Sequence, residues 1–161
     1  MLILNSGGTF NKRYNPLSGE LDVPYDNLAI EAILTNSDCV YTLAGVIYKD
    51  SLEMDLQDRK QLANIVSQSN ECVFVIVHGT DTMDKSAAFL SEIFTDKIII
   101  LTGAMRPFEI DKVEASFNLG MAIGFAKAAH ENGIYICMSG HVKKWDALYK
   151  NKQLGKFELV K

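Results

Sequence analysis

Short apolar runs alternate with amphipathic stretches along most of the chain. The runs are rich in β-branched or aromatic residues and contain few polar ones, which predicts strands buried on both faces. Such strands are expected at residues 2–4, 40–47, 73–77, 98–101 and 134–138. The stretches between them have apolar residues at helical spacing. Helices are expected at residues 28–34, 56–66, 84–90 and 114–131.

Strands that alternate with helices in this way predict βαβ units with right-handed crossovers. The expected fold class is therefore α/β, a three-layer α/β/α sandwich with a mainly parallel sheet of the Rossmann or flavodoxin-like kind. No repeat, low-complexity tract or linker interrupts the 161 residues. We therefore expect one domain over residues 1–161 and no second domain.

Polar residues mark the predicted ends of several helices. Asp26 and Asp55 each come just before a helical pattern and are expected to act as N-caps. In the helix after Asp55, Asp58 and Arg59 fall on the side expected to face solvent. Gly133 follows the last helical pattern, where a residue in the left-handed conformation commonly ends a helix.

The chain has a formal net charge of −4 and a pI near 5.3. Nucleic acids and anionic membranes bind proteins through a basic face, so neither is expected as a partner. Lysines are concentrated toward the end of the sequence, and a run of this kind normally lies on a solvated surface. These lysines are Lys143, Lys144, Lys150, Lys152, Lys156 and Lys161.

The spacing of the cysteines and the first residues of the sequence indicate the cellular compartment of the protein. Cys39, Cys72 and Cys137 lie in or beside apolar segments, with no pair at the short spacing of a metal or redox site. They are expected to be reduced thiols, and no metal site is expected. The sequence turns polar at Asn5, after Met1-Leu2-Ile3-Leu4, so it lacks the features of a signal peptide. A cytoplasmic location is therefore expected.

Two of the predicted strands run directly into polar turns. The strand at 73–77 is followed by His78-Gly79-Thr80-Asp81-Thr82, and the strand at 2–4 is followed by Asn5-Ser6-Gly7-Gly8-Thr9. Parallel strands end at one edge of their sheet, which is where open α/β folds bind ligands. Thr9 and Thr80 are therefore expected to face one crevice.

The segment at residues 11–19 follows the first of these turns. It is polar, rich in turn-forming residues and without periodicity. Segments of this kind commonly form mobile loops that close over a site. We expect a lid at the edge of the sheet.

Structural roles compete with chemical ones for the same side chains. Thr80, Asp81 and Thr82 are also suited to capping the helix that follows them. His78 is not part of a Ser-His-Asp or metal-ligand spacing and is expected to hydrogen-bond at the end of its strand. Taken singly, the structural roles are favoured, and only the combination of motifs favours a catalytic site.

Several segments together carry a family resemblance. They are Gly7-Gly8-Thr9, Tyr14-Asn15-Pro16-Leu17-Ser18-Gly19, Asp50-Ser51-Leu52-Glu53-Met54, His78-Gly79-Thr80-Asp81-Thr82-Met83 and Thr102-Gly103-Ala104-Met105-Arg106-Pro107. In this order they resemble the amino-terminal domain of bacterial-type L-asparaginases, and the cytoplasmic branch of that family more than the periplasmic one. The resemblance covers nearly the whole chain.

The resemblance implies roles for particular residues. Thr9 is the implied nucleophile, and Tyr14 is its partner on the lid. Thr80 and Asp81 match the second catalytic threonine and its carboxylate neighbour, and they are also implied to bind substrate. Lys150 stands where the spacing of the family implies a catalytic lysine, which would set it apart from the other lysines near the end of the sequence.

The implied substrate is a small amino-acid amide, and no metal or organic cofactor is implied. Hydrolysis of L-asparagine, or of glutamine or a related amide, would give the acid and ammonia through a threonyl acyl-enzyme. Ser51 and Leu52 match positions that contact substrate. Leu52 departs from the polar residue usual there, which weakens the expected recognition at one contact.

The identity of the base stays open at this stage. A threonine hydroxyl attacks an amide carbon only as it loses its proton to a neighbour. Tyr14 is one candidate acceptor and Lys150 is the other. Burial would favour a neutral amine on Lys150, whereas Asp81 would favour its ammonium form. Backbone N–H groups in the turn after Val77 are expected to stabilise the oxyanion.

Members of this family carry a second, carboxy-terminal domain, whose residues complete the site of a neighbouring subunit. The 161 residues correspond to the amino-terminal half, so we expect a homo-oligomer or a partner chain that supplies the missing domain. Two other functions stay open. One is an amino-acid-binding module with weak catalysis, and the other is the amidase part of a larger amidotransferase.

Overall fold

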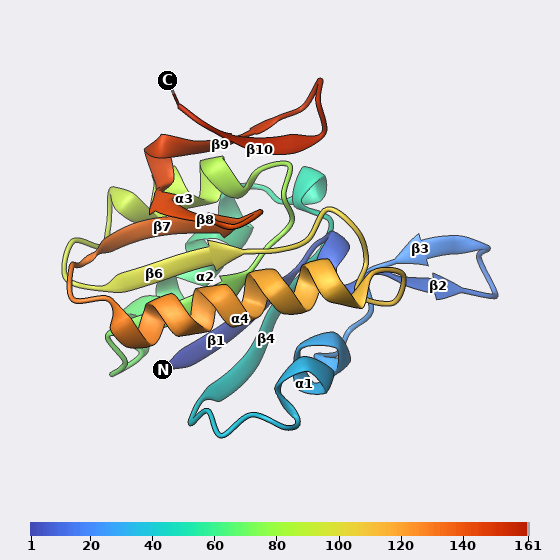
Figure 1. Cartoon of the computed structure of the whole chain (residues 1–161), viewed down its shortest axis with the longest axis horizontal. Coiled ribbons are helices and arrows are strands. Elements are labelled where there is room, and N and C mark those ends of the chain that lie inside the picture. Colours follow the sequence, from blue (N-terminus) through green and yellow to red (C-terminus); the bar gives the residue numbers. More distant parts are fainter. Residues whose placement is uncertain (161) are drawn as a thin grey trace.

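A computed structural model describes residues 1–160 of the chain. Its centre is a six-stranded sheet in the order β4-β1-β5-β6-β7-β8 (Figure 1). These strands are β1 (Leu2–Gly7), β4 (Thr42–Lys49), β5 (Val73–Val77), β6 (Ile98–Thr102), β7 (Gly133–Met138) and β8 (His141–Lys144). All pairs are parallel except β7 with β8, which is antiparallel. The predicted α/β fold with a mainly parallel sheet is confirmed.

Four α-helices within residues 1–160 cover the two faces of this sheet (Figure 1). The helices α1 (Leu28–Leu34) and α4 (Lys112–Ala128) pack on one face. The helices α2 (Leu56–Gln68) and α3 (Met83–Ser91) pack on the other, which completes the three predicted layers. None of the described helices is both long and apolar enough to cross a membrane.

Side chains of β5 alternate between the two hydrophobic cores. Phe74 and Ile76 are fully buried in the core under α2 and α3, and Val75 and Val77 are fully buried in the core under α1 and α4. Burial of a side chain of this size contributes about 1.5–3 kcal/mol. Both faces of the strand are covered, which explains why its sequence is apolar throughout.

Two hairpins stand outside the central sheet. One pairs β2 (Arg13–Asn15) with β3 (Glu20–Asp22), and the other pairs β9 (Leu148–Asn151) with β10 (Lys156–Leu159). The first projects from the edge at which β1 ends, and the second lies beyond β8 (Figure 1).

The β2–β3 hairpin replaces the unstructured loop predicted for residues 11–19. Tyr14 pairs with Leu21 across the two strands. The side-chain amide of Asn15 donates to Asp22 Oδ2 at 2.8 Å. The sequence did not reveal β2 because its partner β3 is exposed along its whole length, so no alternation of apolar and polar residues indicates the pair of strands. The lid stays a prediction.

The start of α2 combines a confirmed cap with two corrections. The carboxylate of Asp55 accepts hydrogen bonds from the N–H groups of Gln57 at 2.7 Å and Asp58 at 3.0 Å, and Asp58 completes a capping box. Asp58 was predicted to face solvent, but it is buried, and its carboxylate binds Lys49 Nζ at 2.8 and 2.9 Å. Arg59 turns inward as well, because its guanidinium donates to side chains at the start of α3.

Asp26 was predicted as the N-cap of α1, but the N-cap is Asn27, whose side chain makes no cap hydrogen bond, and Asp26 lies one residue before it. One carboxylate oxygen of Asp26 accepts from the N–H of Leu28 at 3.1 Å. The other oxygen pairs with the guanidinium of Arg13 on β2. The same carboxylate therefore supports the first turn of the helix and ties the helix to the hairpin.

The end of α4 was predicted wrongly. The helix ends at Ala128, and Ala129 already has extended backbone with φ −71° and ψ 136°. Gly133 instead opens β7 with φ 150°. A Cβ atom at Gly133 would lie 2.6 Å from the Nζ of Lys144 on β8. The Lys144 Nζ is the end of a flexible side chain and could move aside, so glycine is favoured here by the positive φ at the start of β7, not by the termination of the helix.

Asp58→Asn is expected to lower the free energy of unfolding at neutral pH by about 1–2 kcal/mol. Burial alone would raise the pKa of Asp58, but the hydrogen bonds from Lys49 and from the Asp55 N–H outweigh it and hold the pKa below its ordinary value. The carboxylate therefore stabilises the fold fully above its unfolded pKa, and this contribution is lost as the pH falls through the lower folded pKa.

Urea unfolding at neutral and acidic pH measures this difference. The difference in the free energy of unfolding between wild type and Asp58→Asn should disappear in acid. Asp96→Asn changes an exposed carboxylate and serves as the control. A gap that stays constant with pH would contradict the assignment.

Candidate active site

The candidate site lies where the winding of the sheet reverses. The strands β1 and β5 are parallel neighbours, and from them the sheet continues to β4 on one side and to β6 on the other. In doubly wound folds the crevice at the carboxyl ends of such a strand pair is the usual ligand site. The two polar turns identified in the sequence follow these two strands.

The two turns touch through glycine backbone. A Cβ atom at Gly8 would lie 2.4 Å from both the Cα and the N of Gly79, and Gly8 has φ 76°. Neither requirement can be met by a residue with a side chain. Thr9 and Thr80 come directly after these glycines, so the contact brings the two threonines to the same edge of the sheet.

Thr80, Asp81 and Lys150 form one hydrogen-bonded cluster. Lys150 Nζ donates to Thr80 Oγ1 at 2.8 Å and to Asp81 Oδ1 at 2.9 Å. The side chain of Lys150 is only 14% exposed. Lys150 therefore does not belong to the solvated lysines, and the structure brings it to the two residues with which the family resemblance groups it.

The alternation of β9 explains how Lys150 reaches this place. Side chains two residues apart lie on the same face of a strand, so Lys150 shares the inner face with Leu148. Leu148 is buried in the core under α2 and α3, and so is Phe157, which pairs with Lys150 on β10. Tyr149 points to the other face and is 42% exposed. The two apolar anchors thus hold the lysine over the turn at Thr80.

Ser51 lies against the same turn, but Leu52 does not. Ser51 is buried, and a Cβ atom at Gly79 would lie 2.5 Å from its Oγ. This Oγ has no hydrogen-bond partner within residues 1–160. Thr82 Oγ1 donates to the carbonyl of Ser51 at 2.8 Å, so Thr82 joins the segments and does not use its hydroxyl as a helix cap. Leu52 is 67% exposed.

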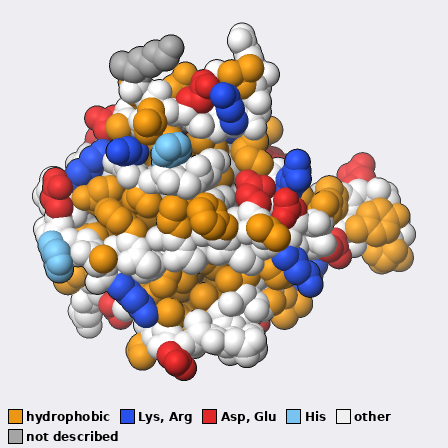
Figure 2. Space-filling view, in the orientation of Figure 1, with side chains coloured by type: hydrophobic (Ala, Val, Ile, Leu, Met, Phe, Trp, Pro, Cys, Tyr) orange, Lys and Arg blue, Asp and Glu red, His pale blue; other side chains and the backbone are white. Residues whose placement is uncertain are grey.

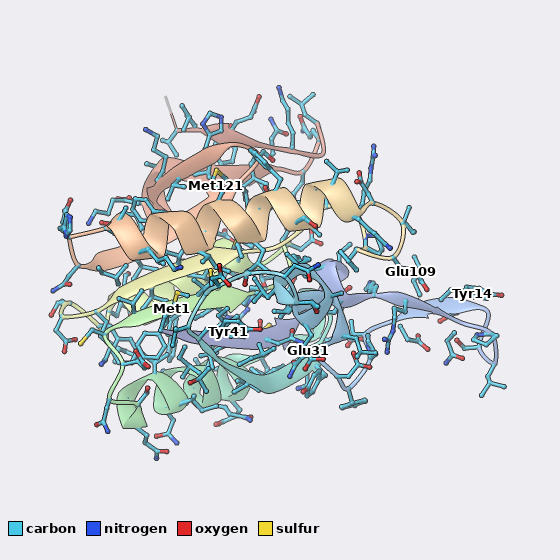
Figure 3. The ribbon with its side chains drawn as sticks, turned by 60° about the horizontal axis from the view of Figure 1, so that its bottom comes forward. Met1, Tyr14, Glu31, Tyr41, Glu109 and Met121 are labelled. Carbon is cyan, nitrogen blue, oxygen red and sulfur yellow. The ribbon has the colours of Figure 1, made fainter. Side chains whose placement is uncertain are left out.

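The structure does not bring Tyr14 to Thr9. Tyr14 is 59% exposed on β2, and Figure 3 shows it far out on the hairpin, directed away from the sheet. Its N–H donates to Glu109 Oε2 at 2.8 Å. The predicted placement of Tyr14 over Thr9 is therefore not found, because the pairing of the hairpin and this contact hold the tyrosine outward.

His78 is fully buried at the end of β5 and hydrogen-bonds there, as predicted. Its Nδ1 lies 2.8 Å from the carbonyl of Gly79, so Nδ1 carries the proton. Its Nε2 has no hydrogen-bond partner within the described part of the chain. Burial lowers the pKa of His78 to about 4, so the ring is neutral at physiological pH.

Sequence reasoning missed the amides that fix the first turn. Asn11 Nδ2 donates to the carbonyl of Gly7 and to Asn5 Oδ1, both at 2.9 Å. Asn5 Oδ1 also accepts from the N–H of Gly7 at 2.9 Å. The available signal was Asn5 itself, a carboxamide directly after the apolar residues 2–4, because buried amides need partners.

An ion pair also supports the turn and was missed. Lys12 Nζ lies 2.6 Å from Asp50 Oδ2, which connects the segment after Thr9 to the segment that holds Ser51. Burial on its own would raise the pKa of Asp50, but the hydrogen bonds from Lys12 and from the Leu52 N–H outweigh it and hold the pKa below its usual value. The pair is far apart in sequence, so no local pattern indicated it.

Within residues 1–160, no three His, Cys, Asp or Glu side chains come together in a group that could hold a metal ion. The groups that the protein itself brings to this edge of the sheet are the hydroxyls of Thr80 and Ser51, the carboxylate of Asp81 and the amine of Lys150, beside the turn that holds Thr9.

Comparison with known proteins identifies the family. A model of the asparaginase N-terminal domain matches residues 1–154. The chain belongs to the asparaginase family. This asparaginase-type domain is 27% identical over 154 residues to a glutaminase-asparaginase of Acinetobacter glutaminasificans. The aligned part covers 88% of this chain and 46% of that protein.

Two further relatives show the range of the family. A glutamyl-tRNA(Gln) amidotransferase subunit of Methanococcus maripaludis is 31% identical over 148 residues, or 86% of this chain and 34% of that protein. The thermostable L-asparaginase from Thermococcus kodakarensis superposes with a TM-score of 0.86 at 22% identity, over 99% of this chain and 50% of that chain. The asparaginase-type domain thus spans half or less of the length of these relatives.

The buried His78 is expected to make this asparaginase-type domain lose stability in acid. The unfolded chain takes up a proton near pH 6.5, whereas the folded chain does so only near pH 4. Stability is therefore full above the unfolded pKa and falls as the pH drops through this window, by of the order of 3 kcal/mol.

Chemical unfolding across this pH range tests the expectation, with His78→Asn as the variant that should flatten the profile. His130→Asn changes an exposed histidine and serves as the control. If His78→Asn does not fold, an NMR titration of wild-type imidazole signals gives the same information. A His78 signal that titrates near neutral pH would refute the assignment.

Proposed function

We propose that this domain carries the hydrolytic site of an amidohydrolase that converts L-asparagine, or a related amide such as glutamine, to the acid and ammonia. The observation that carries the proposal is the cluster of Lys150 with Thr80 and Asp81, at 2.8 and 2.9 Å, beside the turn that holds Thr9. A surface lysine would not need to be buried between a hydroxyl and a carboxylate at a strand edge.

In the proposed reaction, Thr9 is the nucleophile. Its Oγ attacks the side-chain amide carbon, and its proton passes to a base as the tetrahedral intermediate forms. The amide nitrogen then takes up a proton and leaves as ammonia, which produces a threonyl ester. Water attacks the ester, releases the acid and restores the hydroxyl of Thr9.

Lys150 is the better candidate for proton transfer. Tyr14 is exposed on the hairpin, whereas Lys150 already hydrogen-bonds the hydroxyl of Thr80. In the proposed transfer Thr9 gives its proton to the hydroxyl of Thr80, which passes its own proton to Lys150 in the neutral amine form, and the ammonium so formed then protonates the leaving nitrogen. Asp81 orients Lys150 through the contact at 2.9 Å.

Substrate binding is proposed for the remaining groups of the cluster. The carboxylate of Asp81 is 31% exposed and suits the α-ammonium group of an amino acid. The Oγ of Ser51 has no hydrogen-bond partner within residues 1–160 and is proposed as a donor to a substrate carboxylate, which requires the turn at Gly79 to move because this oxygen is buried. Backbone N–H groups of the turn at Gly79 and Thr80, close to the start of α3, suit the oxyanion of the intermediate.

A second candidate function is an amino-acid-binding module with weak catalysis. The outward position of Tyr14 favours it, because one of the two candidate bases does not reach Thr9 in this structure. In that case a partner chain would complete the site, as in an assembly of the kind to which an amidotransferase subunit belongs.

Ammonia release from asparagine and glutamine tests the proposal. Thr9→Ala and Lys150→Met are each expected to lower kcat by about 10²–10⁴-fold, because each removes a group that takes part in covalent or proton-transfer steps. Lys152→Met is the matched control, since Lys152 is exposed in the same hairpin and should leave the rate unchanged.

Binding heats for aspartate, measured on the same proteins, separate the two candidate functions. Aspartate binding without ammonia from either amide would reject the hydrolase in favour of the binding module. Ammonia release that survives Thr9→Ala would remove Thr9 as the nucleophile while leaving the activity itself in place.

A further inference from the structure

The guanidinium of Arg59 joins segments that meet beside the candidate site. Its Nε donates to Ser86 Oγ at 3.1 Å, and one Nη donates to Thr82 Oγ1 at 3.2 Å, so it contacts the start of α3 at two points. Its other Nη donates to the carbonyls of Met54 at 3.0 Å and Asp55 at 2.9 Å, just before α2. These contacts use four of its five N–H donors, all on neutral acceptors. They lie on the face of the sheet covered by α2 and α3, opposite the apolar outer side of α4 at the front of Figure 2.

Thr82 passes the contact with Arg59 on to Ser51. The hydroxyl of Thr82 accepts from Arg59 and donates to the carbonyl of Ser51 at 2.8 Å. Thr82 is the N-cap of α3, but its side chain makes no cap hydrogen bond. A threonine at this position normally stabilises its helix by capping it. The hydroxyl is instead used on both sides for a link between α2, the turn at Thr80 and the segment of Ser51.

The contact of Arg59 with α3 fixes orientation as well as distance. Thr82 and Ser86 lie one helical turn apart, since the N–H of Ser86 donates to the carbonyl of Thr82 at 3.1 Å. A planar guanidinium that contacts both side chains therefore sets the direction in which α3 leaves the turn. Both acceptors are buried, and hydrogen bonds from a charged donor are stronger than those between neutral groups.

We propose that Arg59 is a positioning residue, which holds the turn of Thr80 and Asp81 against the segment of Ser51 at the spacing that the substrate requires. The inference rests on the proposed function, in which Asp81 binds the α-ammonium group and Ser51 the α-carboxylate of one amino acid. Groups that bind the two charges of one small molecule must keep a fixed separation, because reaction requires a precisely placed substrate. Arg59 touches none of these groups and acts on them through Thr82.

The link also limits the movement that substrate binding requires. The turn at Gly79 must move before the buried Oγ of Ser51 can reach a substrate carboxylate. The contacts of Arg59 hold Thr82 at the carbonyl of Ser51 while this happens. The turn can then open at Gly79 without a change in the position of its far end.

Steady-state kinetics of ammonia release from asparagine are the first test. Arg59→Met and Thr82→Val are each expected to raise KM by at least about tenfold and to lower kcat, because a displaced turn misplaces both Asp81 and Thr80. A purely structural role would lower the fraction of folded protein, so kcat would fall while KM stayed unchanged. Lys60→Met changes an exposed residue of α2 and is the matched control.

A double-mutant cycle tests whether Arg59 acts through Thr82. Arg59→Met combined with Thr82→Val should lower kcat/KM no further than the more harmful single substitution, since both remove the same link. Thr82→Ser keeps the hydroxyl and should restore KM to the wild-type value. Additive losses, or an unchanged KM in Arg59→Met, would overturn the proposal.

Amide hydrogen exchange separates failure of this inference from failure of the proposed function. Arg59→Met should speed exchange in residues 79–83, while residues 98–102 of β6 keep the wild-type rates. If wild type releases no ammonia, the hydrolase is rejected, and aspartate affinity takes the place of KM. Local loosening with weaker aspartate binding would then still support the positioning role. Equal exchange in wild type and Arg59→Met, or faster exchange throughout the sheet, would reject it.

Discussion

The contact between Gly8 and Gly79 is the constraint on which the rest of the site depends. Two strand ends that carried side chains at these positions would stand farther apart, and the threonines after them would not share one edge. The parallel pairing of β1 with β5 sets the direction of both strands, and the glycines set the distance. Buried amides, an ion pair and the hydroxyl of Thr82 then hold the surrounding segments against this contact.

The β9–β10 hairpin adds the lysine to this framework. The hairpin follows β8, the last strand of the central sheet along the chain. It contributes the amine of Lys150, a group that the ends of β1 and β5 lack. Its position depends on Leu148 and Phe157 entering the hydrophobic core under α2 and α3. The cluster around Thr80 thus combines an element fixed by strand pairing with an element fixed by apolar anchoring.

Much of the fold follows from local sequence, and much of the site does not. Continuous apolar runs such as Val73–Val77 indicate buried strands, because a strand covered on both faces is apolar throughout. The strand at Glu20–Asp22 gives no such signal because it is exposed throughout. Asp58 and Arg59 were misplaced because helical spacing does not reveal partners such as Lys49 that come from another element. The position of Lys150 required the family resemblance, since charge alone indicated a solvated residue.

Lys150 is held in place through two apolar side chains, so the cluster around it can be lost without unfolding of the sheet. The hairpin pairs only with itself, so its detachment would break none of the ladders of the central sheet. Partial openings of this kind cost less free energy than global unfolding. Heat or mild denaturant would then disconnect the lysine while the sheet, both glycine turns and Thr9 stay native. The integrity of the Lys150 cluster and the integrity of the sheet are two different thresholds in this molecule, and the lower one depends on Leu148 and Phe157.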